Sequence, residues 1–198
     1  MSVIKTIVVQ WLSRLNGLTG VFFILPAMLL ECGFVLQAQN VTSAEYQVKA
    51  VFLFNFTQFV EWPASAFPDR QAPFVIGVLG EDPFGLYLDE TVKGETVNGH
   101  PLVVRRFVSA EEAKACHILF INGDKGDRLK QVLTDLKGRS VLTVSDAADF
   151  ARQGGMIRFI TESNKIRIRI NLEATKDADL TISSKLLRLA EIVDSKHN

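Results

Sequence analysis

Three short, nearly continuous apolar runs constrain the fold more than any other feature of the chain. They are FVIGVLG at residues 74–80, HILFIN at residues 117–122 and VLTVS at residues 141–145. Strands with this pattern are buried on both faces, which is typical of the parallel strands of an α/β protein. Segments with helical spacing of apolar residues separate the runs. The sequence therefore predicts an α/β fold, a three-layer sandwich with a mostly parallel mixed sheet.

Start and stop signals predict where the helices lie. Thr42-x-x-Glu45 resembles a capping box, and the helix that follows must end before Pro63. Asp82-Pro83 predicts another helix, with Asp82 as N-cap and Pro83 in the first turn. Further helices are expected after the capping box Ser109-x-x-Glu112, over Asp127–Leu136, over Asp146–Gln153 and over Ser184–Val193.

The remaining strands predict how the sheet ends. Pro101–Phe107 has the composition of a strand. Met156–Thr161 and Lys165–Leu172 are strand-like and are separated by only three residues, 162–164. This spacing is typical of an antiparallel hairpin, so the mixed sheet is expected to end in one.

The first 38 residues differ in character from the rest of the chain. Residues 15–36 are apolar apart from Glu31, and the densest part, residues 21–30, has the length of a signal-peptide core. Pro26 and Glu31 disfavour a membrane-spanning helix, because a charge near the bilayer centre costs roughly 2.5–3.5 kcal/mol. We therefore expect residues 1–38 to be a signal peptide cleaved after Ala38, with an uncleaved membrane anchor as the alternative. Residues 39–198 then form a single exported domain.

Composition excludes several classes of function. The 22 basic and 22 acidic residues cancel, which argues against a nucleic-acid binder that relies on bulk charge. Two cysteines and three scattered histidines do not form a metal site, and no cofactor motif is present. Removal of Cys32 with the signal peptide leaves Cys116 as a single cysteine. Whether Cys116 is free, buried or part of an intermolecular disulfide stays open at this point.

Polar residues follow the three apolar runs and form a candidate ligand crevice. The carboxyl ends of parallel strands meet at one edge of a sheet, where α/β proteins present residues to ligands. The alternative is that these residues cap helices and form turns, which is their commoner role. They include no nucleophile and base pair, so no catalytic site is predicted. The crevice residues are Glu81, Asp82, Asn122, Ser145 and Asp146.

Two features suggest a surface for a protein partner. Lys165, Arg167 and Arg169 alternate with isoleucines, so a strand places the three cations on one face, where Arg158 of the neighbouring strand extends the row. The alternative is a solvated face whose charges discourage aggregation. The first helix and its end are crowded with aromatic residues, and Phe54 and Trp62 are candidate contacts there.

Several blocks of sequence, in order, resemble the YfiR-like family of periplasmic regulators. The first is YQVKAVFLFNF at residues 46–56, followed by FVEWP at residues 59–63. The later blocks are IGVLGEDPFG at 76–85, CHILFI at 116–121, VLTVSD at 141–146, GGMI at 154–157, INL at 170–172 and SSKLLRLA at 183–190. Together they span most of residues 44–193.

The resemblance implies a small α/β regulator without catalytic activity or cofactor, often dimeric. It implies binding to an inner-membrane sensor, a diguanylate cyclase, whose activity the regulator restrains. It also implies sequestration by an OmpA-like outer-membrane lipoprotein, with cyclic di-GMP and biofilm formation as the output. Cys116 corresponds to a cysteine that takes part in a disulfide in some members. The alternative function is a periplasmic module that binds a small molecule in the crevice and feeds a signalling partner.

Overall fold

An eight-stranded mixed sheet forms the centre of the domain. The computed structural model describes residues 44–123 and 127–193, so the predicted signal peptide and its cleavage after Ala38 lie outside the described residues. The strand order is β10-β8-β7-β6-β5-β2-β4-β3. The strands are β2 (Phe74–Leu79), β3 (Thr96–Val97), β4 (His100–Phe107), β5 (Ile118–Ile121), β6 (Leu142–Ser145), β7 (Ile157–Glu162), β8 (Lys165–Asn171) and β10 (Ala190–Val193).

The predicted mostly parallel sheet is confirmed. From β4 through β2, β5 and β6 to β7, each strand is parallel to its neighbour. β7 and β8 form the predicted antiparallel hairpin. The hairpin does not end the sheet, because β10 adds a further strand parallel to β8. Every residue of β2, β5 and β6 is buried, as the three apolar runs indicated.

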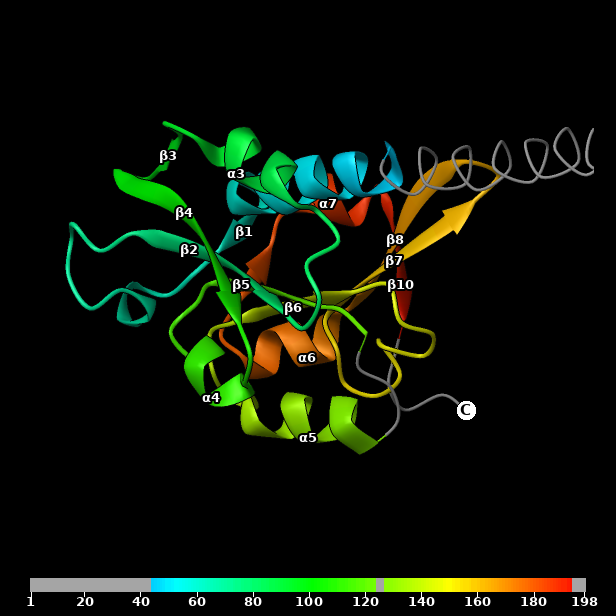
Figure 1. Ribbon diagram of the computed structural model, residues 1–198. Coiled ribbons are helices and arrows are strands. Elements are labelled where there is room, and N and C mark those ends of the chain that lie inside the picture. Colours follow the sequence, from blue (N-terminus) through cyan, green and yellow to red (C-terminus); the bar gives the residue numbers. More distant parts are fainter. Residues whose placement is uncertain (1–43, 124–126, 194–198) are drawn as a thin grey trace, which may run out of the picture. The chain divides into compact units, whose positions relative to one another are not determined.

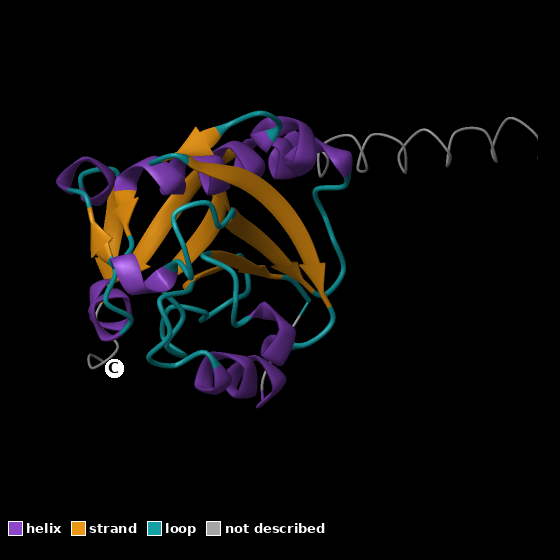
Figure 2. Ribbon diagram, turned by 90° about the vertical axis from the view of Figure 1, so that its left-hand side faces the viewer, coloured by secondary structure: helices purple, strands orange, loops and turns teal. Residues whose placement is uncertain are grey.

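Helices cover both faces of this sheet (Figures 1 and 2). One hydrophobic cluster packs the helix at residues 44–59, together with α3 (Leu86–Val92) and α7 (Ser184–Leu187), on one face. A second cluster packs α4 (Ala110–Ala113) and α5 (Asp127–Asp135) on the other face. Shorter elements are η1 (Ala64–Ala66), α6 (Leu172–Asp177) and the separate antiparallel pair β1 (Val60–Glu61) and β9 (Thr181–Ile182).

The helix predicted to start at Asp82-Pro83 starts later. α3 begins at Leu86, and Gly85 is its N-cap. Asp82 instead accepts the backbone N–H of Phe84 through Oδ1 at 2.8 Å, which makes a turn. An aspartate that bonds the amide two residues on favours a turn as readily as a helix start, and here the turn forms.

Two other helix predictions are wrong in part or in full. Residues 147–154 form turns rather than a helix, and Asp149 has φ of 60°, which a right-handed helix does not allow. Residues 184–193 form helix only as far as Leu187. The chain then enters β10, where Glu191 and Ile192 pair with Arg169 and Ile170. The capping box at Ser109 is confirmed, since its Oγ accepts the N–H of Glu112.

Candidate functional site

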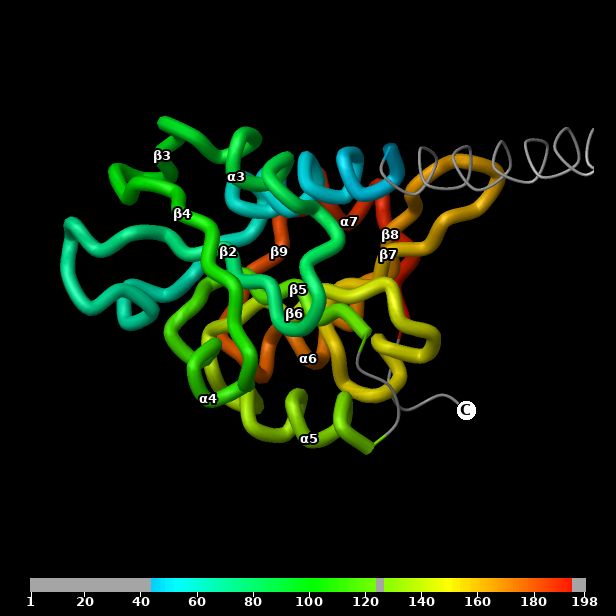
Figure 3. Tube along the Cα trace, viewed as in Figure 1, coloured from blue at the N-terminus to red at the C-terminus, as the bar shows by residue number. Residues whose placement is uncertain are grey.

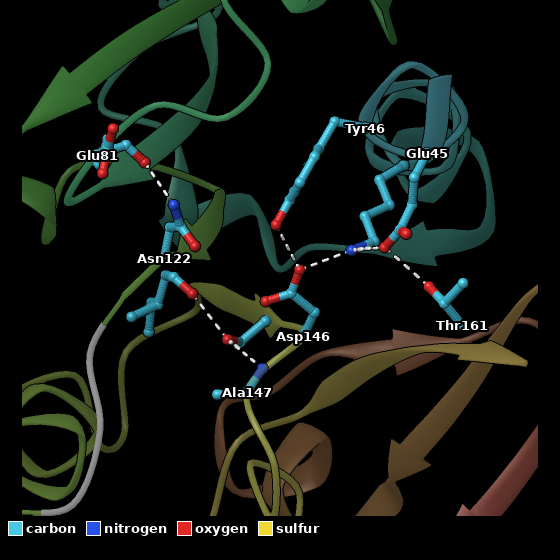
Figure 4. Close-up of polar contacts among 10 residues, drawn as sticks. Glu45, Tyr46, Glu81, Asn122, Asp146, Ala147 and Thr161 are labelled. Atoms are coloured by element: carbon cyan, nitrogen blue, oxygen red, sulfur yellow. Dashed lines mark hydrogen bonds and ion pairs between the residues drawn. The ribbon is translucent and has the colours of Figure 1, made fainter. Parts of the chain in front are cut away.

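The candidate site lies at the carboxyl ends of β2, β5 and β6, where hydrogen bonds join the strand ends to one another (Figure 4). The Asn122 amide nitrogen donates to the carbonyl of Glu81 at 2.7 Å. The Ser145 hydroxyl donates to the carbonyl of Ile121 at 2.7 Å and accepts the N–H of Ala147 at 3.1 Å. The predicted crevice residues therefore do share one edge of the sheet.

Gly80 sets how closely β2 and β5 approach at this edge. Its φ is 93°, and a Cβ on it would lie 2.4 Å from the carbonyl oxygen of Asn122. No L-residue accommodates both constraints without moving the backbone. Gly80, directly after β2, thus acts in strand-end packing, and α3 begins only at Leu86.

Asp82 forms part of a clamp with Arg106 of β4. Arg106 Nε donates to Asp82 Oδ2 at 2.9 Å, and its terminal nitrogens donate to both oxygens of Asp89 and to the carbonyl of Gly85. Hydrogen bonding from Arg106 lowers the pKa of the Asp89 carboxyl, and the same pairing raises the pKa of Arg106. The clamp fixes α3 and its preceding turn against β4.

Asp146 lies opposite the first helix and has different partners. Its Oδ2 accepts the Tyr46 hydroxyl at 2.8 Å and Lys49 Nζ at 2.6 Å. Lys49 also pairs with Glu45 at 2.5 Å, and its Nζ lies 4.3 Å from the centre of the Tyr46 ring. Glu45 accepts the Thr161 hydroxyl of β7 at 2.8 Å. Figure 4 shows these side chains meeting between the helix and the sheet edge.

Burial determines the electrostatics of this group, which we call the Lys49 cluster: Glu45, Tyr46, Lys49, Asp146 and Thr161. The Lys49 side chain is 2% exposed, whereas both carboxylates are 26% exposed. A buried ammonium is stable only when it is paired and hydrogen-bonded, and here two carboxylates surround it. Burial, followed by the hydrogen bond to Asp146, raises the pKa of Tyr46, so its hydroxyl stays a donor.

Sequence reasoning missed Tyr46 and Lys49 as site residues. Lys49 is next to the buried Ala50 and in register with Leu53 and Phe56, which are fully buried. A lysine on the apolar side of a helix, four residues after a glutamate, was the available signal. The second carboxylate, Asp146, lies 97 residues away in the sequence and could not be paired with Lys49 without the fold.

The candidate partner contacts are dispersed. Lys165 and Arg167 are exposed, whereas Arg169 pairs with Glu191 at 2.8 Å. Phe54 and Trp62 are partly buried against the first hydrophobic cluster. The Trp62 indole donates to the carbonyl of His117 at 3.2 Å, and its ring meets Phe74 edge-on. Phe54 and Trp62 thus belong to the first hydrophobic cluster, whereas the basic row lies on β8.

Cys116 and His117 are adjacent in the sequence and point to opposite sides. Cys116 is free and buried in the second cluster, and burial raises the pKa of its thiol. The His117 ring stacks between Phe67 and Phe74, on the other side of the sheet. The two side chains do not form a nucleophile and base pair. Among the described residues, no group of three potential ligands is close enough to hold a metal ion.

Comparison with known proteins places the chain in a family. A model of YfiR/HmsC-like proteins matches residues 46–191, which includes the Lys49 cluster apart from Glu45 and all eight strands of the main sheet except the end of β10. The chain belongs to the YfiR/HmsC-like family. No curated protein matches it.

YfiR/HmsC-like proteins are periplasmic regulators, generally without catalytic activity, that act with a signalling partner. At the sheet edge, Asn122 and Ser145 donate to backbone carbonyls, Asp82 pairs with Arg106, and Asp146 pairs with Lys49. Over residues 44–123 and 127–193, no helix has the length and hydropathy needed to cross a bilayer.

Proposed function

We propose that the protein is a non-enzymatic periplasmic regulator that binds and restrains an inner-membrane sensor, a diguanylate cyclase. The observation that carries the proposal is the family match over residues 46–191. Binding one conformation of the sensor more tightly than the other is sufficient for restraint, because differential affinity shifts the equilibrium between them. An OmpA-like lipoprotein that competes for the same surface would relieve the restraint, and a homodimer would present two such surfaces.

The outer end of β8 is the proposed electrostatic contact. Arg167 is 71% exposed, and its 3.6 Å approach to the exposed Glu162 is weakened by solvent. Lys165 is exposed beside it. Cations at the rim of an interface increase the association rate and select acidic partners. We therefore expect the sensor to present an acidic patch to Lys165 and Arg167.

The helix at residues 44–59 is the proposed apolar contact. Val48 and Val51 are 47% and 41% exposed on it, and Phe54 and Trp62 are partly exposed nearby in the sequence. An exposed apolar strip on a helix is a common docking element. This helix also carries Lys49, and the ion pair of Lys49 with Asp146 connects the helix to the sheet edge.

The proposal is tested by measuring cyclic di-GMP in cells that lack the gene. We expect its level to rise, and expression of the wild-type protein to restore it. An Arg167→Glu variant should restore it poorly, whereas Arg105→Glu, an exposed arginine on β4, should act as the wild type does. An unchanged cyclic di-GMP level in the deletion strain, with the neighbouring cyclases expressed, would contradict the proposal.

A second function, binding of a small molecule that feeds the signalling partner, is favoured by a cavity of about 510 Å³. The cavity lies between α5 and α6, and its lining contains none of the strand-end residues where we expected a ligand. Lys130, Lys137, Asp177 and Gln153 line it, and Gln153 Oε1 is buried with no hydrogen-bond partner in the described part of the chain. A thermal-shift screen tests it, since a ligand at 100 times its Kd adds roughly 2.7 kcal/mol of stability.

A further inference from the structure

A smaller cavity, separate from the Lys49 cluster and from the cavity between α5 and α6, lies at the inner end of the basic row. Its volume is about 140 Å³. Three arginines line it, Arg152 from the turns after β6, Arg158 from β7 and Arg169 from β8. Asp149 and Glu191 are the acidic residues in its lining. We call this cavity the arginine pocket.

Strand register explains why the arginines converge. Arg158 lies directly opposite Arg169 in the β7–β8 hairpin, and Arg169 lies opposite Glu191 of β10. Directly opposed residues on neighbouring strands project to the same face of a sheet with Cβ atoms about 5 Å apart. Like charges in that arrangement repel, so the Arg158–Arg169 pair needs negative charge nearby. Arg152 of the turns at residues 147–154, whose trace follows β6 in Figure 3, lines the same pocket.

The pocket's own carboxylates leave one guanidinium uncompensated. Arg152 pairs with Asp149 at 3.3 Å, and Arg169 pairs with Glu191 at 2.8 Å. The Nε of Arg158 is buried and has no hydrogen-bond partner among residues 44–123 and 127–193. A buried donor of a charged group without an acceptor is costly, typically 1–3 kcal/mol or more. The pocket thus carries a fixed positive charge and a buried N–H donor that lacks an acceptor.

We infer that the arginine pocket binds one oxyanion, the carboxylate or phosphate group of a small metabolite. An arginine fork matches both groups, because two of its parallel N–H bonds meet two oxygens. The volume corresponds to roughly four to five water molecules, which suits a single anionic group rather than a whole nucleotide. The bound anion would accept from Arg158 Nε and offset the repulsion between Arg158 and Arg169.

The inference is tested by NMR titration of the protein with sodium phosphate and, separately, with sodium acetate, at constant ionic strength set with sodium chloride. We expect the Nε–H signal of Arg158 to shift and saturate with at least one of the two anions. Comparing the two titrations shows whether the pocket prefers the tetrahedral or the planar group. Amide signals of residues 149–152 report the affinity in variants that lack Arg158.

Three variants make the test specific. Arg158→Lys keeps the charge but loses the fork, and we expect at least a tenfold loss of affinity. Arg152→Gln, at a residue that is 75% exposed and therefore unimportant for folding, should weaken binding severalfold. Arg105→Lys, an exposed arginine on β4, should leave it unchanged. Absence of saturable binding of either anion, or equal affinity in Arg158→Lys and the wild type, would overturn the inference, whatever the outcome for cyclic di-GMP.

Discussion

Lys49 is the residue whose environment most clearly connects sequence to structure. Its side chain is 2% exposed, and its ammonium is held by Glu45 one helical turn earlier and by Asp146 at the end of β6. Because the two carboxylates are 26% exposed, water stabilises them even without Lys49. The ammonium has no such access to water. The stability of the Lys49 cluster therefore depends unequally on its three charges.

This asymmetry gives a prediction about two substitutions. Asp146→Asn leaves a buried ammonium with one carboxylate, and we expect it to lower the free energy of unfolding by about 2–3 kcal/mol. Lys49→Met removes the buried charge and keeps the apolar volume, so it should cost about 1 kcal/mol or less. Urea denaturation of both variants beside the wild type measures the difference.

Tyr46→Phe is the matched control, because it deletes only the hydroxyl that donates to Asp146 at 2.8 Å. We expect a cost of about 1 kcal/mol. A larger loss of stability in Lys49→Met than in Asp146→Asn would show that the ion pair itself, rather than the burial of an unpaired charge, determines the stability of the cluster.

At the scale of elements, sequence patterns identified buried strands well and short helices poorly. β2, β5 and β6 are buried throughout because both of their faces are covered, and their mostly apolar runs are too short to be read as helices. Leu186, Leu187, Ala190 and Val193 have helical spacing, yet Ala190–Val193 is a strand. Pairing with β8 stabilises that strand, and four residues are too few for local preference to prevail.

The candidate site shows the same limit. Its edge could be predicted, because parallel strands end on one side of a sheet. The contacts between side chains at this edge could not be predicted. Asp146 bonds to Tyr46, which is 100 residues away in the sequence, and Asp82 pairs with Arg106 of β4. The register of the strands could not be predicted either. It places Arg158 of β7 and Glu191 of β10 on either side of Arg169, directly opposite it.

The two-residue turn of the β7–β8 hairpin can be stabilised by substitution. Glu162 pairs with Lys165, so the loop has two residues, and Ser163 and Asn164 have φ of 50° and 59°. These are the dihedrals of a type I′ turn, for which Asn-Gly is the preferred sequence. Replacing Ser163-Asn164 with Asn-Gly should therefore raise the free energy of unfolding by about 0.5–1 kcal/mol.

Thermal or urea unfolding measures the gain, and Asn164→Ala serves as the control. Alanine in the left-handed region is strained by about 1 kcal/mol, so this variant should be less stable than the wild type. The turn assignment would be wrong if the Asn-Gly variant unfolded more easily than the original protein.

For the whole molecule, the sheet separates two hydrophobic clusters of different composition. The first is rich in aromatic residues and contains the stack in which Phe67 lies 4.1 Å from His100 and 4.5 Å from His117, measured between ring centres. The second is mostly aliphatic and contains Cys116. The buried His117 ring thus belongs to the packing of one face, which makes the stability of the domain depend on pH.

His117 determines the direction of that dependence. Its Nδ1 accepts the N–H of Val75 at 3.0 Å, and the side chain is 3% exposed. Burial is the main cause that lowers its pKa from 6.5 to about 4, and the nearby His100 lowers it further. Between these two values the unfolded chain binds more protons than the folded one. Stability is therefore complete above about pH 6.5 and falls as the pH drops towards 4.

We expect the free energy of unfolding to decrease by up to about 3 kcal/mol between pH 7 and pH 4, most of it above the range in which Asp and Glu side chains titrate. Urea denaturation at half-unit steps of pH measures this slope. His117→Gln retains an acceptor for Val75 but does not titrate, so its slope between pH 6.5 and 4.5 should be nearly flat even if the variant is less stable overall. The same slope in variant and wild type would assign the pH dependence to other groups, because only the His117 ring is removed.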